Sequence, residues 1–183
     1  MKNNWNGLLE IEYIEHLDEN NKVIWFDKNL TNILHNTGEK FLLELAFSGG
    51  EIPNYYLFGL DNRTNLTLSG GDGGDSLIYP SVTNNVTTSN PTGEPTGNGY
   101  YRVSVANSSF VVELQEDNHF KAKALTVAFT ATGSGWGPIN NLFLAYINGS
   151  YETVIIASVK LSQSLTLSAG QVINMKMALK LRY

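Results

Sequence analysis

Apolar and polar positions alternate with a period of two along the last stretch of the chain, "VINMKMALKLRY". One parity is apolar throughout: Ile173, Met175, Met177, Leu179 and Leu181. The other parity is polar from Asn174 onward apart from Ala178. Because successive side chains of a β-strand point to opposite faces, this pattern predicts a strand with one face on a core. A slip of one residue would exchange the faces. We therefore expect Val172–Leu181 to be an interior strand, or an edge strand covered by another subunit.

A similar alternation near the N-terminus predicts a β-hairpin. In Leu8–Ile14, the residues Leu9, Ile11 and Tyr13 share one parity, and glutamates occupy the other. A polar, turn-rich segment follows, and Val23–Phe26 then resumes as an apolar strand. Two such strands joined by a short polar loop are typical of a hairpin. We expect an N-terminal hairpin arm over about residues 1–30.

The period changes in "NTGEKFLLELAFSGG", where apolar residues recur at helical spacing. Asn36 or Thr37 is the expected N-cap, and Glu39 would lie in the first turn. Gly49 and Gly50 would end the helix. One short α-helix is therefore expected near residues 37–47.

The rest of the chain is typical of β-structure. A Gly-, Asn- and Pro-rich excursion runs over about residues 61–99, and the island "SLIYPSVTNNVTT" within it is an expected edge strand with Pro80 interrupting the ladder. An excursion of this length usually indicates function or flexibility. From Tyr100 onward, short strands alternate with turn signals, which favours a sandwich or barrel. We expect one domain, residues 1–183, that is mostly β: an antiparallel, jelly-roll-like β-sandwich.

Composition narrows the possible functions. The 183 residues are 42% hydrophobic, which is enough for a core, and the net charge is −5. An acidic chain with scattered basic residues argues against nucleic-acid binding. The chain has no cysteine, so a disulfide framework and a thiolate metal site are excluded. The absence of a long apolar run argues against a membrane span, and no signal peptide is recognisable, so we expect a soluble protein that is not secreted.

No motif indicates catalysis or a cofactor, and we expect none. His16, His35 and His119 fall in expected loops without metal-ligand spacing, so they are interpreted as solvated. Ser134 in "TGSGWG" lacks the pattern of a nucleophile elbow. Asp72 and Asp75 in "SGGDGGDS" offer carboxylates to calcium, but the twelve-residue calcium-loop pattern with its terminal Glu is absent, so a solvated turn is the favoured interpretation. A hydrolase would need convergent carboxylates or a histidine pair, which the sequence does not reveal.

Aromatic residues provide the candidate contact surfaces. Trp136 in its Gly-rich segment is either a core residue or an interface anchor. The pairs Tyr55–Tyr56 and Tyr100–Tyr101 would each send one ring inward and one ring outward. Six residues are the candidate interface: Trp5, Trp136, Tyr100, Tyr101, Asp72 and Asp75.

The order of features resembles that of structural proteins from tailed-bacteriophage particles. The similarity lies in the hairpin, "NTGE" with the helix "KFLLELAF", the strand "YYLFGLDN", the polar excursion, "GPINNLFLA", and "IIASVKLSQSLTLSAGQVINMKMALKL". In that last segment we expect four features in order: a strand, a Ser/Thr-rich link, an Ala-Gly turn and an alternating final strand. The resemblance implies a virion protein, either a capsid decoration (cement) protein or a tail-associated protein, that forms multimers.

Two functions from different classes follow. The first is a non-enzymatic protein that decorates or cements the outside of a phage capsid. Its partners would be the major capsid protein, other virion proteins and its own copies, with a trimer favoured. It would be located in the virion after assembly in the host cytoplasm. The alternative is a tail-associated or receptor-binding β-sandwich that binds carbohydrate through Trp136, Tyr100 or Tyr101.

Overall fold

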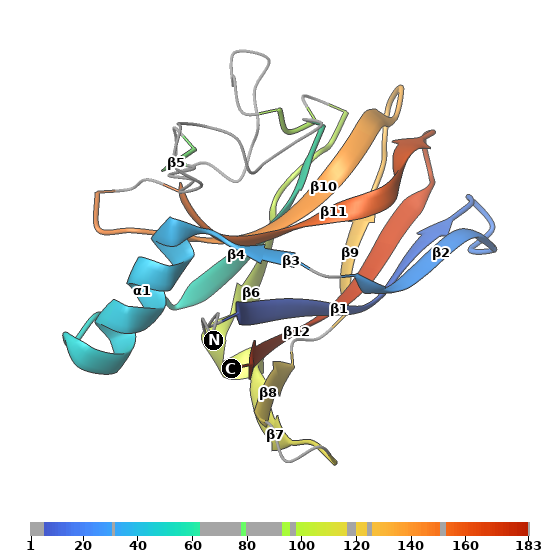
Figure 1. Cartoon of the computed structure of the whole chain (residues 1–183). Coiled ribbons are helices and arrows are strands. Elements are labelled where there is room, and N and C mark those ends of the chain that lie inside the picture. The colour runs from blue at the N-terminus through green and yellow to red at the C-terminus, as the bar shows by residue number, and fades with distance from the viewer. Residues whose placement is uncertain are drawn as a thin grey trace.

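A computed structural model of the chain describes residues 6–30, 32–62, 78–79, 93–95, 98–116, 120–123, 126–150 and 153–182. These residues form two six-stranded antiparallel sheets and one α-helix (Figure 1). The prediction of a mostly-β, antiparallel sandwich is confirmed. Its finer jelly-roll connectivity stays a prediction.

Sheet A has the strand order β2-β1-β12-β8-β7, and β9 also pairs with β12. Its strands are β1 (Asn6–Leu17), β2 (Val23–Leu30), β7 (Val111–Leu114), β8 (Phe120–Lys123), β9 (Val127–Thr130) and β12 (Val172–Arg182). The predicted N-terminal hairpin is β1–β2. The segment "FKAKALTVAFTA", expected as one strand, forms the two strands β8 and β9, which pair with successive parts of β12.

Sheet B has the strand order β3-β11-β10-β4-β6, and β5 also pairs with β11. Its strands are β3 (Asn32–Leu34), β4 (Tyr55–Asp61), β5 (Ile78–Tyr79), β6 (Val103–Ala106), β10 (Trp136–Ile147) and β11 (Thr153–Leu167). The 3-10 turn η1 (Asn107–Ser109) carries the chain from β6 to β7, and thus from sheet B to sheet A. The Ser/Thr-rich link expected after "IIASVKL" is instead part of β11, which stays extended to Leu167.

The main core lies between the two sheets, and β12 contributes to it as predicted. Ile173, Met175 and Met177 are buried, and β12 pairs with β1 on one side and with β8 and β9 on the other. It is therefore an interior strand. This arrangement removes its apolar face from water and satisfies its backbone hydrogen bonds on both sides.

The expected alternation in β1 is interrupted by a β-bulge. The pairing with β12 shifts register between Ile11 and Tyr13, so β1 has one extra residue at Glu12. As a result Ile11 and Ile14, three positions apart, are both fully buried, while Tyr13 is only partly buried. The prediction that Tyr13 shares the core face with Ile11 was wrong, because the bulge reverses the parity.

The helix α1 (Asn36–Phe47) forms where the 3.6-residue period predicted it. Its N-cap is His35, which makes no side-chain cap bond, so the expected capping by Asn36 or Thr37 was wrong. The Thr37 hydroxyl instead donates to the Ile155 carbonyl, at 2.6 Å. At the other end, the Ser48 and Gly50 N–H groups both donate to the Glu44 carbonyl, which ends the helix before the two glycines as predicted.

Gly38 allows the first turn of α1 to lie directly on the backbone of β11. A Cβ at this position would come within 2.1 Å of the Ile156 carbonyl oxygen. The Gly38→Ala substitution should therefore lower the free energy of unfolding by about 1–3 kcal/mol, because the backbone of either element must move. Gly149→Ala, where a Cβ meets nothing within 4 Å, is the matched control and should have little effect. Urea denaturation of the three proteins checks this, and equal midpoints for both variants would contradict the packing argument.

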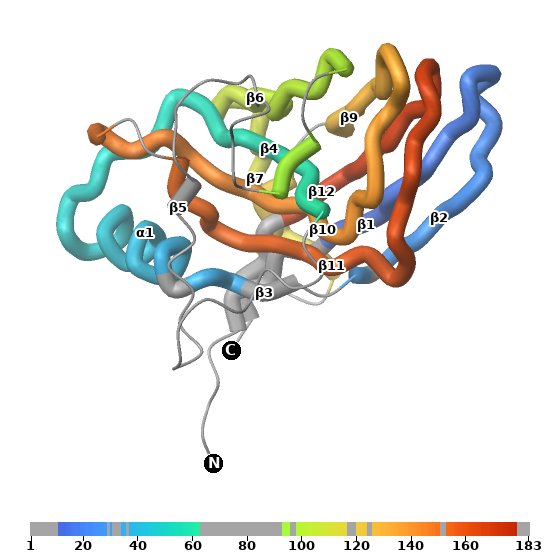
Figure 2. The backbone as a smooth tube through the Cα atoms, turned by 90° about the horizontal axis from the view of Figure 1, so that it is seen from above, coloured from blue at the N-terminus to red at the C-terminus, as the bar shows by residue number. Residues whose placement is uncertain are grey.

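Opposite ends of the sandwich are closed differently (Figure 2). At one end, the turns that follow β1, β9 and β11 lie side by side and are connected by hydrogen bonds, including Gly170 N–H to the Ala131 carbonyl and the His16 ring to Gln171. At the other end, α1 packs against sheet B next to the edge of sheet A. That second end contains the candidate site.

The two ends of the polar excursion meet through a backbone hydrogen bond, next to a buried ion pair. The Asn62 N–H donates to the Gly93 carbonyl at 2.7 Å, so the two ends of the segment meet. Next to them, Arg102 Nη2 lies 2.6 Å from Glu94 Oε2, and both side chains are almost completely buried. Arg102 Nη1 also donates to Thr153 Oγ1 at 2.7 Å. Because nearly every polar atom of the pair has a partner, its burial is tolerated.

Candidate functional site

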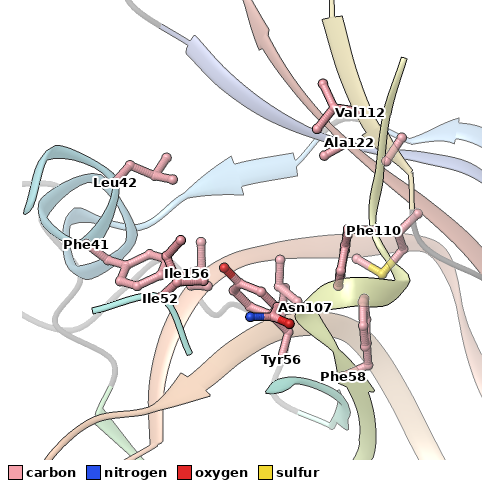
Figure 3. Close-up of a pocket in the computed structure, with 13 residues that line it drawn as sticks. Phe41, Leu42, Ile52, Tyr56, Phe58, Asn107, Phe110, Val112, Ala122 and Ile156 are labelled. Carbon is pink, nitrogen blue, oxygen red and sulfur yellow. The ribbon is translucent and has the colours of Figure 1, made fainter. Parts of the chain in front are cut away.

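An apolar hollow of about 240 Å³ opens at the end of the sandwich where α1 and sheet A cover the same face of sheet B (Figure 3). Sheet B provides its floor through Tyr56, Phe58, Leu144 and Ile156. The size exceeds that of an engineered cavity of about 150 Å³ that binds benzene. The hollow is therefore large enough for a small molecule or a single large side chain.

Its walls come from elements that are far apart in the sequence. The helix contributes Phe41 and Leu42, and Phe41 is held by stacking against Tyr146 with 4.3 Å between ring centroids. Strand β12 contributes Met177 and Ala178. Phe41, Leu42 and Leu45 of α1 pack against the core because their helical spacing places them on one side of the helix, while Leu43 and Phe47 are exposed.

The third wall is the connection between the sheets. Phe110, directly after η1, packs edge-on against the Tyr56 ring at 5.2 Å between centroids. Val112 of β7 and Ala122 of β8 continue this wall outward. The hollow thus exists because the chain crosses from sheet B to sheet A at this point, which leaves space beside the helix.

Two polar side chains, Tyr56 and Asn107, line this otherwise apolar space. Partial burial raises the pKa of the Tyr56 hydroxyl above its ordinary value, so it is neutral at physiological pH and can donate a hydrogen bond. No Lys, Arg, Asp or Glu side chain is among the described residues around the hollow. The site therefore suits an uncharged occupant.

The β7–β8 hairpin beside the hollow presents an apolar face to solvent. Cross-strand pairing brings Val112 opposite Ala122 and Leu114 opposite Phe120, so these four residues share a face. Val112, Leu114 and Phe120 are 66%, 59% and 63% exposed. The opposite face is polar, with Glu113 and Lys123 forming a 2.8 Å ion pair. The hydrogen bond from Lys123 lowers the pKa of Glu113.

The other edge of sheet A is similarly apolar. In β2, Val23, Ile24 and Phe26 are 47%, 50% and 50% exposed. Among the described residues, no strand pairs with the outer side of β2 or β7. Both edges of sheet A thus combine open backbone hydrogen-bonding positions with exposed apolar side chains.

Two of the sequence-predicted contact residues lie in the core. Trp136 and Tyr100 are 5% and 2% exposed, and their rings meet edge to face at 5.5 Å. The Trp136 indole N–H donates to the Asn98 carbonyl at 3.0 Å, and the Tyr100 hydroxyl donates to Glu94 and accepts from the Leu60 N–H. Burial beside Glu94 raises the pKa of Tyr100 well above its ordinary value. This corrects the expectation that these rings are exposed.

The remaining candidate interface residues are Tyr101, which is exposed, and three residues that lie outside the described part of the chain. Tyr101 is 53% exposed and Tyr55 is 59% exposed, so each tyrosine pair sends one ring outward as predicted. Trp5, Asp72 and Asp75 lie outside the described residues. Of the three candidates that the structure describes, Trp136, Tyr100 and Tyr101, none lines the hollow or belongs to the β7–β8 hairpin.

The histidines differ from the sequence interpretation. His16 and His35 are 6% and 1% exposed, so they are not solvated loop residues. The His16 ring hydrogen-bonds the Gln171 side chain. His35, at the start of α1, has its ring nitrogen 2.8 Å from the hydroxyl of Ser158 in β11. His119 lies outside the described residues. In the described part of the chain, no group of three or more His, Cys, Asp or Glu side chains could hold a metal ion.

Sequence reasoning missed the exposed hairpin and the hollow. A signal was present, since Phe120 and Ala122 alternate with Lys121 and Lys123. Alternation predicts a two-faced strand, but it does not say whether the apolar face is covered. One ring of the pair Tyr55–Tyr56 was expected to point inward, but the space beside Tyr56 depends on α1 and η1.

Comparisons with known proteins supply no relative. No protein-family model, no curated protein and no solved structure matches this chain. Within the described ranges, no helix has the length and apolarity needed to cross a membrane.

Proposed function

We propose that this protein is a non-enzymatic structural component of a tailed-phage particle that decorates or cements the outside of the capsid. Its copies associate with one another, with a trimer favoured, and with the major capsid protein or other virion proteins. The observation that carries the proposal is that both outer strands of sheet A, β2 and β7, expose apolar side chains along edges that no described strand covers.

The physical reason is that such edges are costly for a protein that functions alone. An unpaired edge offers backbone N–H and C=O groups to any extended segment, and soluble proteins usually protect it with charges, proline or a covering element. Here the edges carry exposed Ile24, Phe26, Val112 and Leu114 beside the charged Asp27 and Lys28 of β2 and Glu113 of β7. Strand addition by a neighbouring protein would bury these side chains and satisfy the backbone, which is a recognised mode of association.

A carbohydrate-binding tail protein ranks second. That function needs exposed aromatic rings on which a sugar can stack. Of the three rings considered for it, Trp136 and Tyr100 are buried and only Tyr101 is exposed. The assembly function therefore has more support from the described surface.

Self-association of the purified chain tests the assembly surfaces. In sedimentation velocity we expect the wild type to exceed the monomer mass at micromolar concentration. Leu114→Lys on β7 and Ile24→Lys on β2 should each shift it toward the monomer, because a lysine on an edge strand opposes pairing. Tyr101→Lys, an equally exposed site outside β2 and β7, is the control and should leave the association unchanged. A wild type that stays monomeric at every concentration would remove the support for multimeric contacts.

The location is tested separately in particles purified from the natural source of the chain. Quantitative mass spectrometry should find the protein in numbers comparable to the major capsid protein if it decorates the shell. A few copies per particle would place it in the tail instead. Its absence from the particles would overturn the proposal.

A further inference from the structure

We propose that the hollow between α1, β4, η1 and β7–β8 is a binding site for a small, uncharged aromatic compound that carries one hydrogen-bonding group. This inference does not depend on the proposed function, since it concerns the interior of the hollow and not the edges of the sheet. The argument rests on its volume, its aromatic walls and its two polar side chains.

Volume limits the ligand to a small molecule. An engineered cavity of about 150 Å³ holds benzene, which has six non-hydrogen atoms. Scaling to about 240 Å³ gives room for roughly ten such atoms. This is smaller than the roughly 300–1,000 Å³ of pockets that bind drug-sized ligands. A bicyclic aromatic compound therefore fits, while a long acyl chain does not.

The walls favour an aromatic ring over an aliphatic one. Four aromatic side chains line the hollow: Phe41, Tyr56, Phe58 and Phe110. The Tyr56 ring meets the Phe41 and Phe110 rings edge-on, and all three rings border the space. An aromatic ligand is stabilised by such edge-to-face or offset contacts beyond the burial of its area.

The polar groups define the head of the ligand. The Tyr56 hydroxyl and the Asn107 side-chain amide both line the hollow (Figure 3). Neither group hydrogen-bonds another described residue, and the bonds of Asn107 to described residues are made by its backbone. Each can donate and accept, so together they suit one neutral N–H or O–H group. A carboxylate would be rejected, because no described cation lines the hollow to offset its desolvation.

Indole is a suitable probe because it has nine non-hydrogen atoms and one N–H donor. Isothermal titration of the full chain should show saturable binding of indole. Indene, which has the same shape without the N–H, should bind about two- to tenfold more weakly, the factor that corresponds to one hydrogen bond. Indole-3-acetate, which is charged, should not bind measurably.

Variants then locate the site. Tyr56→Phe keeps the ring and removes the hydroxyl, so indole binding should weaken about two- to tenfold, while Tyr55→Phe on the opposite face should have no effect. Ala122→Phe fills the hollow from its partly exposed wall and should reduce indole binding more than tenfold.

The circular dichroism spectrum of each variant checks that it is folded. If the folded Ala122→Phe protein binds indole as tightly as the wild type, or if indole does not bind the wild type at all, the proposal is overturned. Binding by Leu114→Lys should be retained, which separates this site from the proposed assembly surface.

Discussion

Replacing Arg102 by leucine should lower the free energy of unfolding by about 3–5 kcal/mol, because Glu94 loses the guanidinium that balances its charge in the interior. Arg102 and Glu94 are each 3% exposed, and the guanidinium makes two short contacts to the carboxylate, from Nη2 at 2.6 Å and from Nε at 2.9 Å. A carboxylate without its partner and without water pays a large desolvation cost. Urea denaturation at neutral pH measures the loss as a lower midpoint.

The control for this prediction is an exposed pair of the same chemistry. Lys40 and Glu44 lie one helical turn apart on α1, 3.3 Å from each other, with side chains 74% and 46% exposed. Lys40→Ala should change the midpoint little, since water and salt already screen that pair. Adding Glu94→Gln to Arg102→Leu should recover part of the loss, because it removes the buried charge that the guanidinium balanced. If the urea midpoint of Arg102→Leu is as close to that of the wild type as the midpoint of Lys40→Ala is, the buried-pair argument is refuted.

Truncation of Trp136 to alanine is expected to cost about 3–5 kcal/mol, the range for a large buried aromatic residue. The indole is 5% exposed, packs edge to face against Tyr100 and donates its N–H to the Asn98 carbonyl. Its removal leaves a cavity at the closed end of the sandwich and takes away one of the two hydrogen bonds to the Asn98 carbonyl, the other being donated by the Thr132 hydroxyl. Thermal unfolding followed by near-ultraviolet circular dichroism should show a melting temperature lowered by several degrees or more.

The same substitution separates a core role from a contact role. A surface anchor could be truncated with almost no loss of stability, and Tyr101→Ala, at a ring that is 53% exposed, should behave in that way within about ±0.5 kcal/mol. If Trp136→Ala has the same melting temperature as the wild type, the indole does not contribute to the core, and Trp136 must be interpreted as a surface residue. If both variants melt early, Tyr101 has a packing role that its exposure does not reveal.

The boundaries of regular elements were predictable wherever the pattern was local. The hairpin β1–β2, the helix over residues 36–47 and the final strand follow from periodicities of two and 3.6 residues. Each of these patterns is confined to a dozen residues, so the sequence contains the complete signal. The bulge at Glu12 was not predictable, because it depends on how β1 pairs with β12, a partner more than 160 residues away.

The candidate site was much less predictable than the fold. Val112, Leu114 and Phe120 have the residue types of a covered strand face, and the sequence shows no difference between them and the buried residues of β12. Trp136 and Tyr100 have residue types that occur both in cores and at interfaces. Their burial follows from the turns that close one end of the sandwich, and these turns are brought together by contacts between distant segments.

The sequence by itself determined the secondary structure class, the helix over residues 36–47 and the two faces of β12, because each depends on side chains that are close together along the chain. Only the tertiary structure decided which apolar faces are covered. Two sheets and one helix cannot cover every apolar face at once, so the pairing order leaves β2 and β7 at the edges of sheet A and leaves a hollow beside α1. Coverage is a property of the neighbours of a residue in space, which is why the same alternating pattern gives an interior strand at β12 and an exposed face at β7–β8.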